Sequence, residues 1–262
     1  NEGIDRNHNP EFTQIEFYQA YQDYQYCMNL VEDLLAKVVP TVAGNCKLQH
    51  EGVELDFTPP FARLSFAEAI KKYADIDLAR YNICHDSMPS PQGGGMTGII
   101  PGNDLKQAVE KLGLKIEPQW GRGEIMDEIF KKKVVPQIVQ PTFIFDYPIE
   151  LSPLAKKKPD NPTYVERFQL VTHGIECANA FTELNDPLDQ RERFLEQERL
   201  RQGGLEEAQR IDEYFILALE HGMPPATGCG IGLDRLATLL TDSHAVKEVI
   251  LFPTLKPSRK DY

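Results

Sequence analysis

The chain alternates polar and apolar residues at its start, as β-strands do. From residue 12 onward the positions fall on two faces, with Phe12, Gln14, Glu16 and Tyr18 on one and Thr13, Ile15 and Phe17 on the other. We expect a strand that buries Ile15 and Phe17, so the opposite face is left for water or a ligand. The alternative is an ordinary amphipathic surface strand.

Glycines alternate near the other end of the chain. Gly228, Gly230 and Gly232 would leave one strand face without side chains. Glycine inside a strand marks a place where another backbone or a flat ligand comes close. Arg235 follows as the chain turns into the amphipathic run LDRLATLL, and its guanidinium suits phosphate. The alternative is a glycine-rich strand packed tightly against a helix.

Between these segments the pattern predicts helices, two hairpins and one irregular stretch. Helices are expected within 19–39, 65–73, 104–112, 123–133, 186–202 and 205–221. The first helix has Leu30, Leu34, Leu35 and Val38 at helical spacing, and the second opens with a Ser65–Glu68 capping box. Hairpins are expected at 47–57, turning at Glu51–Gly52, and at 167–184, turning at His173–Gly174, with a further strand at 139–148. Residues 75–103 lack apolar periodicity and are interpreted as an irregular insertion. Strands joined mostly by hairpins, with helices grouped between them, predict an α+β domain around an antiparallel sheet.

Composition narrows the class of protein. The chain has 262 residues, 41% hydrophobic and 26% charged, which is typical of a globular protein. No apolar stretch approaches the ~20 residues of a membrane span, and no signal peptide is visible. Five cysteines are scattered without C-x-x-C spacing, and the six histidines are equally dispersed. This argues for a reducing compartment and against both a disulfide framework and a zinc site.

Four runs carry a resemblance to a known family: NEGIDRNHNPEF (1–12), PTFIFDYPIELSPLA (141–155), ECANAFTELNDP (176–187) and GIGLDRLATLLTDSHAVKEVILFP (230–253). Together they resemble the class II aminoacyl-tRNA synthetases, and among these the lysyl-tRNA synthetases. The resemblance implies that 1–262 is a single catalytic domain with the class II fold, an antiparallel sheet flanked by helices. It places Asn1 inside motif 2, just after the arginine that holds the α-phosphate. We therefore interpret the chain as a fragment without motif 1 or the anticodon-binding OB-fold, from a parent that forms a homodimer through motif 1.

The residues themselves indicate a site for an ammonium group. Asn179, Phe181 and Glu183 share one strand face. An ammonium group stripped of water needs opposite charge on several sides, which Glu16, Glu183 and the Tyr18 hydroxyl would supply. The resemblance implies this role for them toward lysine, with Asn179 holding the lysine carboxylate and Phe181 packing on the stem. The alternative for Glu183 is a helix cap.

The resemblance also implies an ATP site. Phe12 would stack on adenine, Glu2 and Asn9 would contact its polar edge, and His8 would lie near the phosphates. Arg235 would contact the γ-phosphate as a catalytic residue, above the bare face of Gly228, Gly230 and Gly232. The alternative for His8 and Asn9 is turn chemistry before Pro10.

The metal ligands depart from the family pattern. The family usually has two glutamates seven residues apart that hold Mg²⁺, and this chain has Gln169 and Glu176. A neutral amide oxygen is a weaker ligand for a hard cation, which puts Gln169 in doubt. Strict alternation would also place Glu176 on the face opposite Glu183, unless a bulge intervenes or its role differs.

The leading interpretation is a cytoplasmic lysine–tRNA ligase core. Its expected partners are ATP with Mg²⁺, L-lysine and tRNA(Lys), and no membrane association is expected. The net charge of −12 is unfavourable for RNA binding, so a separate basic element would grip most of the tRNA. The runs Lys131–Lys133 and Lys156–Lys158 either meet the acceptor end or are solvated. One alternative is a paralogue that lysylates a protein. Another is a non-catalytic domain that binds lysine, nucleotide or a partner.

Overall fold

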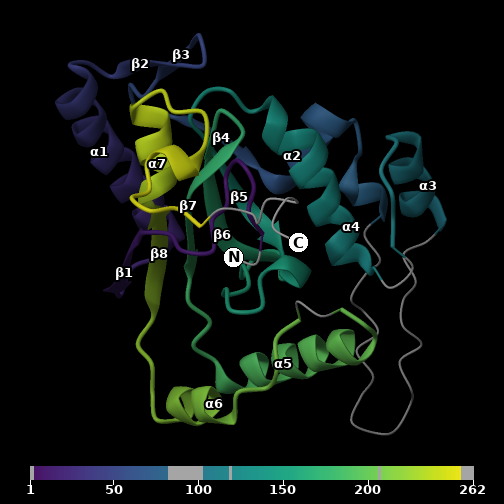
Figure 1. Ribbon diagram of the computed structural model, residues 1–262. Coiled ribbons are helices and arrows are strands. Elements are labelled where there is room, and N and C mark those ends of the chain that lie inside the picture. Colours follow the sequence, from purple (N-terminus) through teal and green to yellow (C-terminus); the bar gives the residue numbers. More distant parts are fainter. Residues whose placement is uncertain (1–2, 82–102, 118–119, 206–207, 255–262) are drawn as a thin grey trace, which may run out of the picture.

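A six-stranded sheet forms the centre of the computed structural model, which describes residues 3–81, 103–117, 120–205 and 208–254 (Figure 1). Its strand order is β1–β8–β7–β6–β5–β4, with β1 Gln14–Ala20, β4 Ala62–Ser65, β5 Thr142–Pro148, β6 Tyr164–Thr172, β7 Ile175–Thr182 and β8 Ala226–Gly232. All neighbouring strands are antiparallel except β4 and β5. A separate hairpin joins β2 Lys47–His50 to β3 Val53–Asp56. The predicted α+β class is confirmed.

Seven α-helices are present in the described ranges: α1 Tyr24–Ala43, α2 Phe66–Ala74, α3 Asn103–Lys111, α4 Arg122–Ile129, α5 Pro187–Gln202, α6 Glu213–Glu220 and α7 Leu233–Leu240. A π-turn at Phe130–Val134 continues α4, and 3-10 turns lie at Leu78–Tyr81, Val135–Gln137, Ile149–Leu151 and Val246–Glu248. The Ser65–Glu68 capping box is present, and Asp186 caps α5. None of the described helices combines the length and apolar character that a bilayer crossing requires.

Both faces of the sheet carry an apolar core, because successive strand residues point in opposite directions. On one face α1, α7 and the β2–β3 hairpin pack against Phe168, Leu170 and Ile231. On the other, α2 and α4 pack against Ile144, Val165 and other residues of β4, β5 and β6. Figure 1 shows α2 and α4 gathered at the β4–β5 side, with α5 and α6 beyond one end of the sheet. Over β1, β8 and β7, none of the described helices covers the second face.

One prediction of burial was wrong in part, and the structure shows which apolar stripe of α1 is buried. In α1 the buried stripe runs through Cys27, Val31, Leu35 and Val39, whereas Leu30 and Leu34 are 37% and 36% exposed. Two apolar stripes compete on this helix, and the one spaced by four residues meets the sheet. Ile15 is 45% exposed, because β1 is an edge strand with a neighbour on one side only.

Element boundaries also moved at two helices. Strand β1 continues to Ala20 and the Asp23 side chain accepts a hydrogen bond from Tyr26 N, so α1 starts at Tyr24 rather than near residue 19. Helix α6 starts at Glu213, not near Leu205, because the Asp212 side chain caps it through Phe215 N. In the expected insertion 75–103, Leu78–Tyr81 forms a 3-10 turn, and residues 82–102 lie outside the described chain.

Candidate active site

The floor of the site is formed by two rows of residues that cross β1, β8 and β7. Gly230 pairs with Glu16 on one side and Asn179 on the other. Gly228 likewise pairs with Tyr18 and Phe181. Because paired residues point to the same face, each row has two functional side chains separated by a glycine. The rows therefore form a trough with a bare centre.

The glycines differ in what lies above them. A Cβ atom added at Gly228 would lie less than 3.0 Å from the Glu183 carboxylate and the Tyr18 ring. At Gly230 the nearest atom is Gln14 Oε1, 3.8 Å away, so the space above it is open. Gly228 is thus needed for the positions of two neighbours, and Gly230 leaves room for a ligand.

A cavity of about 370 Å³ lies over the trough. The residues singled out from the sequence that line it are Asn9, Phe12, Glu16, Tyr18, Glu176, Asn179, Phe181, Glu183, Gly228, Gly230, Gly232 and Arg235. Two others, His8 and Gln169, do not line it, and Glu2 lies outside the described residues. The fold thus gathers twelve of the fifteen residues from three segments that are distant in sequence.

One end of the cavity is acidic. The Tyr18 hydroxyl donates a hydrogen bond to Glu16 Oε1 at 3.2 Å. Burial raises the pKa of Glu183 to about 7, and the charge of Glu16 adds to this effect. Burial and the same two carboxylates raise the pKa of Tyr18 as well. Within the described ranges neither glutamate forms an ion pair, so this end has the electrostatics of a cation site.

The helix-cap alternative for Glu183 does not hold. The side chain of Asp186 accepts hydrogen bonds from Leu188 N and Asp189 N and caps α5. Glu183 instead forms an isolated β-bridge with Ala155, and its carboxylate lies over Gly228.

Arg167 is a residue of the site that sequence reasoning missed. Its Nε donates to Asn179 Oδ1 at 3.1 Å, and its Nη1 donates to Leu151 O and Ser152 Oγ. The guanidinium lies 4.7 Å from the Tyr147 ring centre. With Oδ1 of Asn179 occupied, the amide nitrogen is the group left for a ligand. The predicted His173–Gly174 hairpin without a bulge would pair Arg167 with Ala180, whereas the observed register pairs it with Phe181. The sequence therefore contained no signal that Arg167 reaches the site.

The opposite end of the cavity is cationic. Arg235 lies in the first turn of α7, and its Nη1 donates to Glu176 O at 2.9 Å. The same nitrogen is 3.9 Å from Glu176 Oε2. Asp234 accepts a hydrogen bond from Thr13 N at 2.7 Å, which ties the segment after Phe12 to α7. Arg235 therefore lies at the end of the trough opposite to Glu16 and Glu183.

The loop before β1 has its own internal bonds. His8 Nδ1 lies 2.9 Å from both Asp5 carboxylate oxygens. Asn9 is 2% exposed, and its Nδ2 donates to Glu11 O at 2.6 Å. The turn chemistry expected as the alternative for these two residues is present, although Asn9 also borders the cavity.

A bulge decides the place of Glu176. The β6–β7 register pairs Leu170 with Ala178 and then Val171 with Glu176, so Cys177 is an extra residue. Because of this extra residue, Glu176 points to the same cavity face as Asn179. Of the two alternatives for Glu176, a bulge or a different role, the bulge is present. Gln169 also points to that face, but its Oε1 accepts a hydrogen bond from Tyr147 Oη at 2.7 Å. Glu176 fits as an oxygen ligand for a metal ion, and Gln169 does not.

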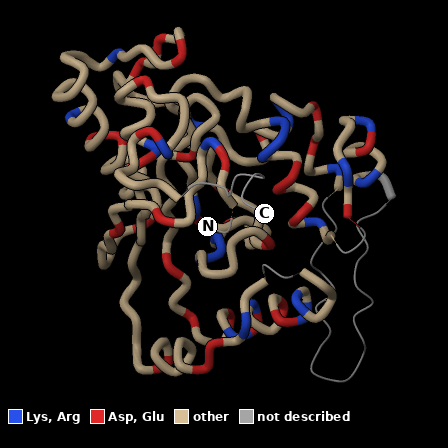
Figure 2. The backbone as a smooth tube through the Cα atoms, viewed as in Figure 1, with Lys and Arg blue, Asp and Glu red and all other residues tan. Residues whose placement is uncertain are grey.

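The basic runs are partly neutralised within the fold. Lys157 pairs with Asp189 at 2.9 Å, and Lys158 pairs with Asp146. Lys131 pairs with Asp127 at 2.6 Å. Figure 2 shows basic and acidic residues interspersed along α5 and elsewhere in the described chain. Lys157 and Lys158 are therefore partly buried ion-pair partners and not a freely solvated run, and the contact of these runs with RNA stays a prediction.

The described sheet has a glycine-rich strand next to an acidic pocket, with Arg235 in the first turn of α7. The same features carry the sequence resemblance to the class II synthetases. The family model described as tRNA synthetases class II (D, K and N) matches residues 1–256, and the chain belongs to that family.

Curated relatives narrow the similarity. The chain is 48% identical over 260 residues to the lysine–tRNA ligase of Moorella thermoacetica, covering 99% of this chain and 50% of that protein. It is 44% identical to the lysine–tRNA ligase of Pelotomaculum thermopropionicum and 46% identical to that of Syntrophomonas wolfei, covering 98% of this chain and 48% of each. The chain spans about half the length of these relatives.

Proposed function

We propose that the protein is a lysine–tRNA ligase, with residues 1–262 forming its catalytic domain. It activates lysine with ATP to lysyl-adenylate and transfers the lysyl group to tRNA(Lys). The observation that carries the proposal is the pair Glu16 and Glu183, two carboxylates without a cationic partner among the described residues, at one end of a trough that ends at Arg235. The similarity to lysine–tRNA ligases supports it independently.

Lysine fits the acidic half of the cavity. Its ε-ammonium lies between Glu16 and Glu183 and restores the ionised state of Glu183. Its aliphatic stem packs on Phe181, and the amide nitrogen of Asn179 holds its carboxylate. An aspartate or asparagine side chain would bring no positive charge to the two carboxylates. Both amino acids are therefore disfavoured as substrates.

ATP occupies the other half. Phe12 stacks on adenine, with Glu2 and Asn9 at its polar edge and Gly230 and Gly232 beneath. Gly228, expected in the ATP site from the sequence, is covered by Glu183 and Tyr18 and belongs to the lysine half. Arg235 holds the γ-phosphate, and His8 reaches the phosphates by leaving Asp5. Glu176 would hold a Mg²⁺ ion, which would offset phosphate charge when bound together with ATP. One carboxylate would be enough, because proteins usually bind Mg²⁺ through one or two carboxylates together with substrate phosphates.

The chemistry rests on position and charge. The lysine carboxylate attacks the α-phosphorus in line, and its bond to the bridging oxygen breaks as pyrophosphate leaves. A tRNA ribose hydroxyl then attacks the acyl carbon and releases AMP. Asn179 orients the nucleophile and Arg235 stabilises the leaving pyrophosphate. Neither step requires a covalent bond to the protein.

Assembly and location are part of the proposal. We place the protein in the cytoplasm as a homodimer. Apolar side chains along the β1 edge and the outward face of α1 support a partner surface, among them Ile15, Tyr21 and Val42, which are 45%, 77% and 59% exposed. Sedimentation that gives a compact monomer for the intact protein at micromolar concentration would contradict the dimer.

Calorimetric titration with lysine, aspartate and asparagine tests the substrate. We expect binding of lysine alone, and equal binding of all three, or of none, would contradict the proposal. Lysine-dependent ATP–pyrophosphate exchange then tests activation by the intact protein. Transfer of labelled lysine to tRNA(Lys) rather than to a protein acceptor separates the ligase from a protein-modifying paralogue. Lysine binding without exchange would identify a non-catalytic domain.

A further inference from the structure

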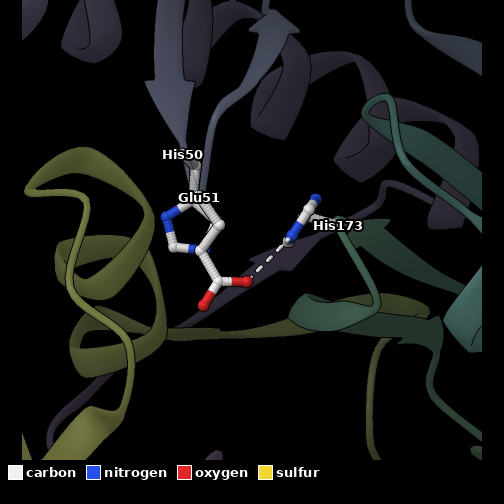
Figure 3. A group of neighbouring side chains, drawn as sticks. All are labelled: His50, Glu51 and His173. Carbon is white, nitrogen blue, oxygen red and sulfur yellow. Dashed lines mark hydrogen bonds and ion pairs between the residues drawn. The ribbon is translucent and has the colours of Figure 1, made fainter.

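A second cluster of ligand-type side chains lies at the tip of the β2–β3 hairpin, and its three members do not line the cavity. His50 and Glu51 belong to this hairpin, and His173 to the turn between β6 and β7 (Figure 3). One nitrogen or oxygen atom from each lies within 4.8 Å of the others. Histidines dispersed in the sequence are thus brought around one carboxylate by the fold.

His50 is the most unusual member. Its side chain is fully buried, and neither ring nitrogen has a hydrogen-bond partner among the described residues. The nearest carboxylate oxygen, Asp242 Oδ1, is 3.7 Å from Nδ1 and already accepts a hydrogen bond from Glu51 N. A buried polar ring without a partner is costly, so its presence points to a ligand.

The two carboxylate oxygens of Glu51 have different partners. Oε1 is engaged by Arg6 at 2.5 Å and by His244 Nδ1 at 2.6 Å. Oε2 faces His173 Nε2 at 3.4 Å, the pair drawn as a dashed line in Figure 3. Nδ1 of His173 has no partner within the described residues. One carboxylate oxygen and three ring nitrogens are therefore available without breaking the Arg6 contact.

We propose that His50, Glu51 and His173 bind a divalent transition-metal ion of the zinc class. Two imidazoles and one carboxylate suit Zn²⁺, whereas Mg²⁺ and Ca²⁺ prefer oxygen ligands. Ligands around a tetrahedral Zn²⁺ with ~2.0 Å bonds lie roughly 3.3 Å apart, so rotamer changes at two turns close the site. His244, whose side chain is 70% exposed, or water supplies the fourth ligand.

The ion would connect two turns that are distant in sequence. One belongs to the β2–β3 hairpin and the other to the hairpin whose second strand carries Glu176 and Asn179. Cross-linking them stabilises the folded state in proportion to metal occupancy. The site differs from the cysteine-based zinc site that the sequence argues against, because its ligands are histidine and glutamate.

Metal titration of the stripped protein tests the site. After EDTA treatment and its removal, we expect Zn²⁺ to bind with one-to-one stoichiometry and to raise the melting temperature, and Co²⁺ to give visible absorption bands. Millimolar Mg²⁺ should not displace either ion. Absence of saturable one-to-one Zn²⁺ binding would overturn the proposal.

Matched histidine variants locate the ion. His173 has φ of +49°, which asparagine tolerates, so His173→Asn should fold normally. It should weaken Zn²⁺ binding at least tenfold, since even outer partners of a metal contribute 10- to 100-fold. His221→Asn, at the end of α6, should bind like the wild type. Equal Zn²⁺ affinity in the two variants would contradict the site, as would unchanged affinity in Glu51→Gln.

Discussion

Two halves of one sheet face differ in what covers them. Over β4, β5 and β6, helices α2 and α4 bury Ile144, Val165 and their neighbours in a dry core. Over β1, β8 and β7 the same face holds a cavity in which Glu16 and Glu183 have no ion pair among the described residues and the space above Gly230 is open. Both halves belong to the same sheet. The helices that cover each half and the side chains on its strands therefore determine which half is a core and which holds the cavity.

Side chains at the boundary connect the two halves. Tyr147 is buried in the core half and donates to Gln169, and Arg167 stacks on its ring. From there Arg167 reaches Asn179 in the open half. The rigid core thus positions a residue of the site, as precise binding requires.

Removing charge from the open half gives the largest expected effect. Breaking a buried ion pair from one side costs about 3–5 kcal/mol. Glu183→Gln keeps the shape and removes the charge, so lysine affinity should fall several-hundred-fold. ATP affinity should stay within threefold, because adenine is assigned to Phe12 and β8. Calorimetry with both ligands separates the outcomes, and lysine affinity within threefold of wild type would place the ammonium elsewhere.

Cutting the link between the halves should matter less. Hydrogen bonds to charged groups contribute about 1.5–3 kcal/mol. Arg167→Gln should weaken lysine binding about tenfold or more by freeing the Asn179 amide, with ATP affinity unchanged. As a control, Asn179→Ala should show a similar loss, and the double variant should lose no more than the larger single loss. Fully additive losses would mean that Arg167 does not act through Asn179.

The glycines offer a matched pair within the open half. Gly228→Ala should reduce lysine affinity roughly 10- to 30-fold, because overpacking by a methyl group displaces Glu183 and Tyr18 at a cost of about 1–3 kcal/mol. Gly230→Ala meets open space and should leave the melting temperature and Glu183 unchanged. Equal lysine affinity in Gly228→Ala and the wild type, measured by titration, would show that the close approach is unimportant.

Local pattern predicted much of the open half. Alternation placed Glu16 with Tyr18, and Asn179 with Glu183, on common faces, and turn residues located the His173–Gly174 hairpin. These features depend on neighbours in the sequence, whose geometry the backbone period dictates.

Features that depend on pairing between distant strands were less predictable. Nothing in the residues around Cys177 marks a bulge, so the face of Glu176 stayed open until the register was known. The partner of Arg167 lies across the sheet, and α1 offered two apolar stripes with no local reason to prefer one. Strand register and the orientation of a helix about its axis are determined by tertiary contacts, not by the local sequence.

The pH dependence of lysine binding tests the central claim most directly. Burial and the charge of Glu16 raise the pKa of Glu183 to about 7, and lysine binds the ionised form. The ammonium lowers that pKa, so binding releases a proton below pH 7, and affinity falls as pH falls. Between pH 8 and pH 6 the ionised fraction drops about tenfold, and lysine affinity measured by calorimetry should drop equally. Glu183→Gln should remove this dependence. Wild-type affinity that is constant or rises from pH 8 to pH 6 would contradict the assignment of Glu183 as the ammonium partner.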